Sequence, residues 1–324
     1  MQPQGELFDI GYQRYDGPRE GRPRARRTIF EDGMRTILGI GRGGRAKILP
    51  ALLFLSAIIP ALIFVLILSF AEPAADFLPG PADYYSVISF LMLIFAAISA
   101  PELLVSDRRN NVIYLYLVRP LTVNDYLLGR FLAFFVLVTA LAYSGQIILQ
   151  VGIILTASDP VQHLQDEWTD IPRFLFAGLV VALFITALPM AAAAFTYRRA
   201  YAAIIVIGLF FISAGVADAL TSPVGTCTTT TEVDAEGNVS TETVCDEEGA
   251  ITGDAAKWYA LISLRDVPLR VNDMIFDIAV NDEEGPPSII VGQELPAIVP
   301  IAVYLFFTAG PLGLLWLRYR RIRA

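Results

Sequence analysis

Six long apolar stretches alternate with polar segments along this chain of 324 residues. They cover Leu49–Ala71, Tyr85–Leu104, Phe131–Ala157, Phe174–Phe195, Tyr201–Leu220 and Pro296–Leu317. About 20 apolar residues in helical form are enough to cross a hydrocarbon core of about 30 Å. Backbone groups in lipid have to pair within their own segment, so each stretch is predicted to be a transmembrane helix. The pattern therefore predicts an all-α membrane protein with six spans.

Composition and charge agree with this prediction and orient it. Only 17% of the residues are charged, against about 25% in typical soluble domains. Twenty of the 24 Lys and Arg residues lie in four segments, namely residues 1–48, 106–130, 197–200 and the C-terminal tail, whereas most Asp and Glu residues lie in the other connections. Since basic connections stay on the cytoplasmic side, we expect both termini in the cytoplasm and a multi-pass protein of the cell membrane.

Residues 1–48 are predicted to form a cytoplasmic segment that contains an amphipathic helix over residues 28–39. Thr28 and Glu31 fit a capping box, which would start this helix. Its apolar positions recur at helical spacing: Ile29, Phe30, Met34, Ile37 and Leu38. We expect this helix to lie in the membrane interface before the first span. The basic run Arg22–Arg27 just before it is interpreted as an orientation signal.

The remaining boundaries follow from the spans. Residues 49–220 hold the first five transmembrane helices, with a cytoplasmic segment at 105–130, and residues 296–324 hold the sixth span and a basic tail. Residues 221–295 form the large extracytoplasmic loop. Within that loop, residues 266–280 are amphipathic and are expected to form a helix on the outer membrane surface.

Cys227 and Cys245, the two cysteines of the chain, both fall in this extracytoplasmic loop. On the oxidising side of a membrane a disulfide is the expected state of such a pair. Many β-branched residues lie between them, around a turn at Gly237, which predicts a small β-hairpin closed by the disulfide. A metal site built on two cysteines without a nearby histidine is disfavoured.

Few polar groups interrupt the spans. Ser144, Gln146 and Gln150 lie in the third span, and the two glutamines share one helix face. Such groups serve either in helix packing or along a transport pathway, and both interpretations stay open. No Asp, Glu, Lys or Arg occupies the middle of a span, which argues against an ion-coupled carrier.

The sequence offers no catalytic constellation, since it contains a single histidine. Residues 39–44 fit the pattern G-x-G-x-x-G, but no strand and soluble helix flank them as a nucleotide site requires. The sequence also contains no G-x-x-x-x-G-K-[ST] motif. We therefore expect neither an enzyme nor a metal or nucleotide cofactor in this chain, and no nucleic-acid partner.

The segment Ser106–Tyr126, between the second and third spans, is amphipathic and does not cross the bilayer. Val112, Leu115 and Tyr116 are predicted on one face of a short helix that Pro120 ends, and Thr122 with Asp125 resembles a capping box at the start of the next helix. The segment is either an amphipathic loop on the bilayer or a docking element for a cytoplasmic partner.

Residues 102–130 resemble the stretch E…DR…GT…YL…RP(L/I)SR…Y(L/I)…GK of type-2 ABC transporter permeases, the ABC-2 exporter family. The matching positions are Glu102, Asp107, Arg108, Arg109, Leu115, Tyr116, Leu117, Arg119, Pro120, Leu121, Asp125, Tyr126, Leu127, Leu128, Gly129 and Arg130. The chain departs from the pattern at residues 110–112, where a Gly-Thr pair is common, and at Arg130, where Lys is common.

This resemblance implies a permease subunit that works as a dimer and pairs with a separate cytoplasmic ABC ATPase, which would bind ATP and Mg²⁺. It implies that the coupling residues are Asp107, Arg108, Arg109, Tyr116, Arg119 and Pro120, with residues 28–38 as a second contact. The substrate stays open, although the scarcity of polar groups in the spans mildly favours an amphiphile. The alternatives are an ion-coupled carrier or channel, and a membrane-anchored structural or sensory protein that displays the outer loop.

Overall fold

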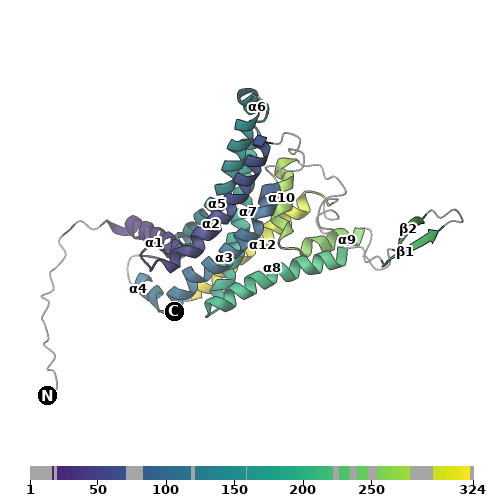
Figure 1. Cartoon of the computed structure of the whole chain (residues 1–324). Coiled ribbons are helices and arrows are strands. Elements are labelled where there is room, and N and C mark those ends of the chain that lie inside the picture. Colours follow the sequence, from purple (N-terminus) through teal and green to yellow (C-terminus); the bar gives the residue numbers. More distant parts are fainter. Residues whose placement is uncertain are drawn as a thin grey trace, which may run out of the picture.

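The computed structural model describes Gly17 and residues 20–70, 83–117, 121–157, 159–221, 226–233, 239–246, 254–277 and 295–321. Its helices are α1 Gly21–Leu38, α2 Arg45–Phe70, α3 Asp83–Arg109, α4 Val112–Leu117, α5 Val123–Thr156, α6 Pro160–Asp166, α7 Asp170–Phe195, α8 Arg199–Thr221, α9 Asp254–Tyr259, α10 Asp266–Phe276 and α12 Ile298–Arg320. Two strands, β1 Thr226–Val233 and β2 Val239–Asp246, form an antiparallel pair. Figure 1 shows the long helices gathered into one bundle.

Six of these helices are long and apolar enough to cross a membrane: α2, α3, α5, α7, α8 and α12. The prediction of six spans is confirmed. Most helices extend past the apolar stretches, because polar end residues continue the helical hydrogen bonding. The Thr122 capping box is also present: the Thr122 hydroxyl accepts from the Asp125 N–H at 3.3 Å, and the Thr122 N–H donates to the Asp125 carboxylate at 3.0 Å.

The interior of the bundle is formed mainly by α3, α5 and α7. These helices bury small residues and aromatic rings against one another, including Tyr84, Phe95, Phe134 and Phe184. Helices α2 and α12 bury few of their side chains, as expected for helices at the periphery that meet lipid. Helix α1, helix α4 and the C-terminal end of α12 lie together at one end of the bundle, which we call the basic end (Figure 1).

Helix α1 differs from its prediction in two ways. It begins at Gly21, so Thr28 lies inside the helix and donates to the Arg24 carbonyl at 2.9 Å, while Glu31 pairs with Arg27 at 2.7 Å. The predicted capping box of Thr28 and Glu31 is therefore wrong, because arginine-rich residues upstream continue the helix. Ile29 and Ile37 are buried as expected, but they pack against the bundle rather than into the membrane interface.

The contact between α1 and α5 is close enough to require glycine on both helices. A Cβ atom at Gly33 would lie 2.7 Å from the Cβ of Ala133, and one at Gly129 would lie 2.8 Å from Cγ2 of Ile29. Both distances are well below van der Waals contact. The two backbones therefore approach through small residues, as helices commonly do when they pack closely.

The connection between α8 and α12 also departs from expectation. Helix α10 packs against α7 and α12 with Val267 and Leu269 buried, so the predicted surface position is wrong for residues 266–276, and residues 278–280 lie outside the described residues. In the β1–β2 pair, Cys227 and Cys245 are opposite each other in the Cα register. The side chains of both strands lie outside the described residues, so the disulfide stays a prediction.

Candidate functional site

Helix α4 closes the turn between α3 and α5 at the basic end. The chain reverses after α3 through Asn111, whose φ of 54° falls in the left-handed region that asparagine tolerates better than most residues. Ile113 is buried, whereas Tyr114 and Leu115 are 57% and 69% exposed. A helix of six residues is too short to be stable alone, so its contacts with the bundle hold it in place. Helix α4 thus presents one tyrosine and one leucine outward.

Tyr116 faces the opposite way and joins a stack of three rings. Its ring lies 5.8 Å from that of Tyr126 in α5, which in turn lies 6.0 Å from the ring of Tyr319 in α12. Burial raises the pKa of the Tyr116 hydroxyl above its usual range. The prediction that Tyr116 and Leu115 share one helix face is wrong, since Tyr116 contacts the bundle and Leu115 is exposed.

Close to α4 lies a polar group that we call the Arg130 cluster, made of the buried Asp107, Tyr126 and Arg130 and the half-exposed Asp32. The Arg130 guanidinium, only 2% exposed, pairs with Asp107 Oδ2 at 2.7 Å and with Asp32 Oδ2 at 2.9 Å. The Tyr126 hydroxyl donates to the same Asp107 oxygen at 2.8 Å. The cluster ties α1, α3 and α5 together close to α4.

Arg108 and Glu102 fix the same end of α3 to two further helices. The Arg108 guanidinium donates to the carbonyl oxygens of Ala193, at 2.6 Å, and of Ala194 and Thr196, which lie where α7 ends. A cation at a helix C-terminus also complements the helix dipole. Glu102 pairs with Arg42, before α2, and with Arg199 at the start of α8. Arg109, in contrast, is exposed.

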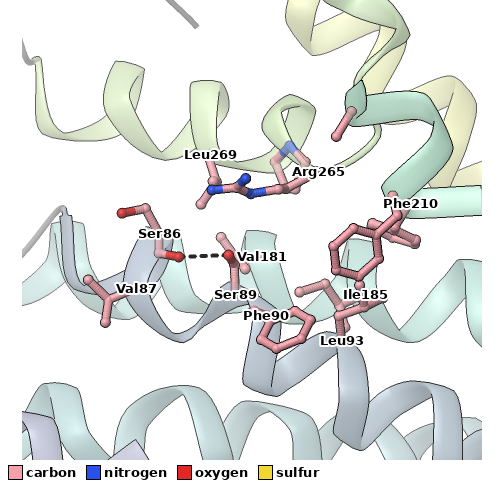
Figure 2. Close-up of a pocket in the computed structure, with 13 residues that line it drawn as sticks. Ser86, Val87, Ser89, Phe90, Leu93, Val181, Ile185, Phe210, Arg265 and Leu269 are labelled. Carbon is pink, nitrogen blue, oxygen red and sulfur yellow. Dashed lines mark hydrogen bonds between the residues drawn. The ribbon is translucent and has the colours of Figure 1, made fainter. Parts of the chain in front are cut away.

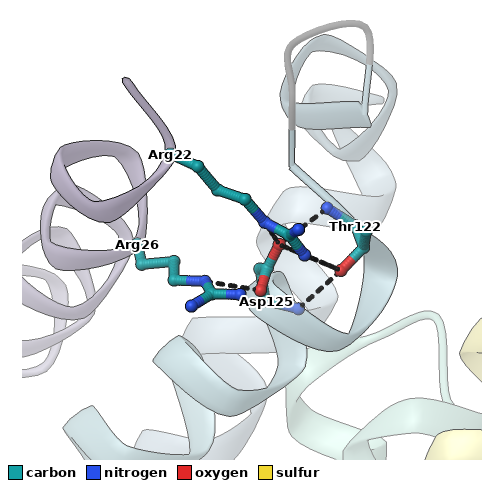
Figure 3. Close-up of polar contacts among 4 residues, drawn as sticks. All are labelled: Arg22, Arg26, Thr122 and Asp125. Carbon is teal, nitrogen blue, oxygen red and sulfur yellow. Dashed lines mark hydrogen bonds and ion pairs between the residues drawn. The ribbon is translucent and has the colours of Figure 1, made fainter. Parts of the chain in front are cut away.

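Helix α1 is bound to the start of α5 through Asp125, as Figure 3 shows. Arg22 Nη2 lies 2.7 Å from Asp125 Oδ2, and Arg26 Nε lies 2.6 Å from Asp125 Oδ1. The same carboxylate accepts the Thr122 N–H, so it caps the helix and pairs with two arginines at once. Arg22 and Arg26 belong to the basic run that was interpreted as an orientation signal. Their ion pairs with Asp125 are a structural role that the sequence did not indicate.

The polar groups of the third span lie within helix contacts. Ser144 donates to the Leu141 carbonyl of its own helix at 2.8 Å, and Gln146 is fully buried. Gln150 is partly buried on the same helix. Of the two open interpretations, these positions favour helix packing. A pathway role stays a prediction.

Helix α10 contributes polar residues that the sequence analysis missed. Asp266, Arg270 and Asn272 are all nearly fully buried, and burial raises the pKa of the nearby Asp273 carboxyl to about 6. Asp266, Arg270 and Asp273 recur at helical spacing, so they share one face. Their spacing was visible in the sequence, but nothing in the sequence indicated that this face turns inward.

Two of the predicted coupling residues, Arg119 and Pro120, lie outside the described residues. Within the described ranges, no three His, Cys, Asp or Glu side chains are grouped so as to hold a metal ion. The polar centre of the molecule at the basic end is thus a set of ion pairs that joins helices around α4.

Comparison with known proteins identifies the family. A family model described as "ABC-2 family transporter protein" matches residues 25–319, which run from α1 to the end of α12. No curated protein sequence matches the chain. The match covers far more of the chain than the resemblance of residues 102–130 and agrees with it. The chain belongs to the ABC-2 family of transporter proteins.

Proposed function

We propose that this chain is the permease subunit of an exporter driven by ATP, and that a separate cytoplasmic ABC ATPase docks on α4. Membership of the ABC-2 family and six apolar helices support a membrane permease. The positive-inside rule supports a basic end that faces the cytoplasm. ATP and Mg²⁺ would bind the ATPase, and a second permease, identical or related, would complete the transporter.

The observation that carries the proposal is the exposed pair Tyr114 and Leu115 on a helix that is held firmly from below. Tyrosine is among the typical anchors of protein interfaces, and Leu115 adds apolar area beside Tyr114. Arg109 is exposed beside them and adds a positive charge. Together these three side chains form the proposed docking surface.

The buried residues have a different role in this proposal. Asp107, Arg108 and Tyr116, first assigned to partner contact, bind other parts of the same chain. They position α4 and pass its displacement to α1, α3, α5 and α7. Arg119 and Pro120 keep the coupling role assigned from the sequence, and Arg119→Glu is expected to weaken association with the ATPase.

The test is affinity purification of the permease in mild detergent from its native host, with quantification of the co-purifying ATPase by mass spectrometry. Tyr114→Ala combined with Leu115→Ala removes a tyrosine anchor of about 2 kcal/mol together with its aliphatic neighbour, so recovery is expected to fall by at least 10-fold. Tyr201→Ala is the matched control, because Tyr201 is 55% exposed at the start of α8. Equal ATPase recovery from the double variant and the control would overturn docking on α4.

The same preparation separates the alternative functions. In reconstituted vesicles, the proposed transporter needs ATP and a Walker A lysine in its partner. An ion-coupled carrier would instead follow an ion gradient without nucleotide, and a structural or sensory protein would transport nothing. Transport that persists without nucleotide would contradict the proposal.

A further inference from the structure

A cavity of about 390 Å³ lies between α3, α7, α8 and α10, away from the docking surface. Figure 2 shows α3 and α10 facing each other across it, with Ser86 and Ser89 on one side and Arg265 and Leu269 on the other. Ligand sites in proteins usually have volumes of about 300–1,000 Å³, so the space is large enough for a small molecule. Ser86 lies one turn from the start of α3, and Arg265 directly precedes α10. The cavity therefore lies toward the end of the bundle opposite the basic end.

The lining is almost entirely apolar, with aliphatic and aromatic side chains from all four helices. Ser86, Ser89 and Arg265 are its polar members. The Ser86 hydroxyl donates to the Asp83 carbonyl and the Ser89 hydroxyl donates to the Ser86 carbonyl, each at 2.7 Å. Both hydroxyl protons are thus used within α3, and Arg265 supplies the donors that a ligand would meet.

Arg265 forms a loose ion pair with Asp266 and no hydrogen bond to it through Nε, so its guanidinium can also receive an anionic ligand. Its Nε lies 3.9 Å from Asp266 Oδ1, beyond hydrogen-bonding distance. The side chain is 47% exposed, and its planar guanidinium can bind a carboxylate or phosphate through two parallel hydrogen bonds. One cation at the edge of an otherwise apolar cavity matches a molecule with one anionic group and an apolar body.

The wall toward the membrane is formed by two aromatic side chains. Phe90 of α3 and Phe211 of α8 are 48% and 54% exposed, and their rings meet edge to face at 5.7 Å. Both side chains are exposed on helices that are apolar enough to span a membrane. A ligand that partitions into the membrane would reach the cavity by this side.

We propose that the cavity binds an amphiphile that carries an oxyanion head group, with the head at Arg265 and the apolar chain against Phe90, Leu93 and Phe210. A carboxylate and a phosphate head share the required chemistry. The identification of this amphiphile as the exported cargo rests on the proposed function, whereas its binding does not.

Photo-crosslinking to the purified, full-length permease in nanodiscs of neutral lipid tests the binding. Four probes carry the same chain with a terminal diazirine and differ in the head: a carboxylate, a phosphate, an uncharged amide and a primary amine. We expect the two anionic probes to label residues that line the cavity at least 10-fold more than the other two. The ratio of carboxylate to phosphate labelling distinguishes the two sources of the head group.

Two variants make the outcome specific. Arg265→Gln is expected to reduce anionic labelling at least 10-fold, and Arg265→Lys to retain most of it. Arg173→Gln is the matched control, since Arg173 of α7 is also partly exposed, at 39%, and pairs with Asp170. Equal labelling by the four probes, or labelling that Arg265→Gln leaves unchanged, would show that the cavity holds chains without regard to charge and would overturn the proposal.

The failure of this inference is distinguishable from failure of the proposed function. Arg265 lies toward the end of the bundle opposite α4, so the Arg265→Gln variant is expected to co-purify with the ATPase as the wild type does. Labelling without any associated ATPase would leave the anion site standing and contradict the transport proposal. Normal ATPase association without selective labelling would contradict the anion site and leave the transport proposal standing.

Discussion

Replacement of Arg130 by methionine is the most direct test of the Arg130 cluster. Methionine keeps much of the length of the side chain but removes its charge. Asp107, which is 9% exposed, would then keep the Tyr126 hydroxyl at 2.8 Å and lose the guanidinium at 2.7 Å. A buried carboxylate without a cation costs several kcal/mol, so we expect Arg130→Met to destabilise the fold by about 3–5 kcal/mol.

The double variant Asp107→Leu with Arg130→Met separates the two sources of this cost. If the loss comes from an unpaired buried charge, removing the carboxylate as well returns most of the stability, because apolar replacement of a buried ion pair is often neutral. If the loss comes from damaged packing, the double variant is at least as unstable as the single one. Asp32, at 49% exposed, stays in solvent contact in either case.

The assay is equilibrium unfolding in mixed micelles of mild detergent and sodium dodecyl sulfate, followed by circular dichroism. Arg199→Met is the matched control, because Arg199 is 48% exposed and its pair with Glu102 should contribute about 0–1 kcal/mol. An Arg130→Met variant within about 1 kcal/mol of this control would refute the reasoning, as would a double variant no more stable than the single.

Three further predictions concern packing, pH and the outer loop. Gly33→Ala should lower the free energy of unfolding by about 1–3 kcal/mol in the same assay, since its Cβ would meet Ala133. Gly44→Ala, with open space around the new Cβ, is the control and should change this free energy little. Equal effects of the two substitutions would contradict the close contact at Gly33. Burial raises the pKa of Asp273 to about 6, so the folded state holds this proton more tightly than the unfolded state, and stability from this group should fall as pH rises from about 4 to 6. Asp273→Asn should therefore stabilise the protein at pH 8 by about 1–2 kcal/mol and not at pH 4, which thermal unfolding at both pH values would check. Mass spectrometry without reductant should find Cys227 and Cys245 joined, and two free thiols in the mature protein would refute the predicted disulfide.

The spans were predictable because lipid imposes one simple rule on composition and length. Each apolar stretch had to be a helix, and the structure adds only polar turns at their ends, as where α5 begins at Val123. The capping pair Thr122 and Asp125 was readable for a similar reason, since capping depends on residues within one turn. The helices and several of their ends were therefore predictable from local sequence.

The sequence did not predict what each amphipathic helix face packs against. An apolar stripe on α1 fits a membrane surface and a protein surface equally well, and the choice was made by Gly33 and Gly129, which let α1 approach α5. In α10 the face that carries Asp266 and Arg270 is turned inward, and both side chains are buried. The sequence alone does not say which other helices pack against that face. Tyr116 and Leu115 are adjacent in sequence, yet one is an anchor and the other is exposed.

Helix α3 joins the two proposed sites within one element. Asp107 and Arg108, at its basic end, attach it to the surroundings of α4, while Ser86 and Phe90, near its other end, line the cavity. Its 27 residues span about 40 Å as a helix. Pro101 interrupts its backbone hydrogen bonding between these ends, a position where a helix bends at low cost. A displacement of α4 by a docked ATPase would therefore move the part of α3 that follows Pro101. The bend angle at Pro101 would set how far the part that precedes it, with Phe90 and the cavity wall, moves in response.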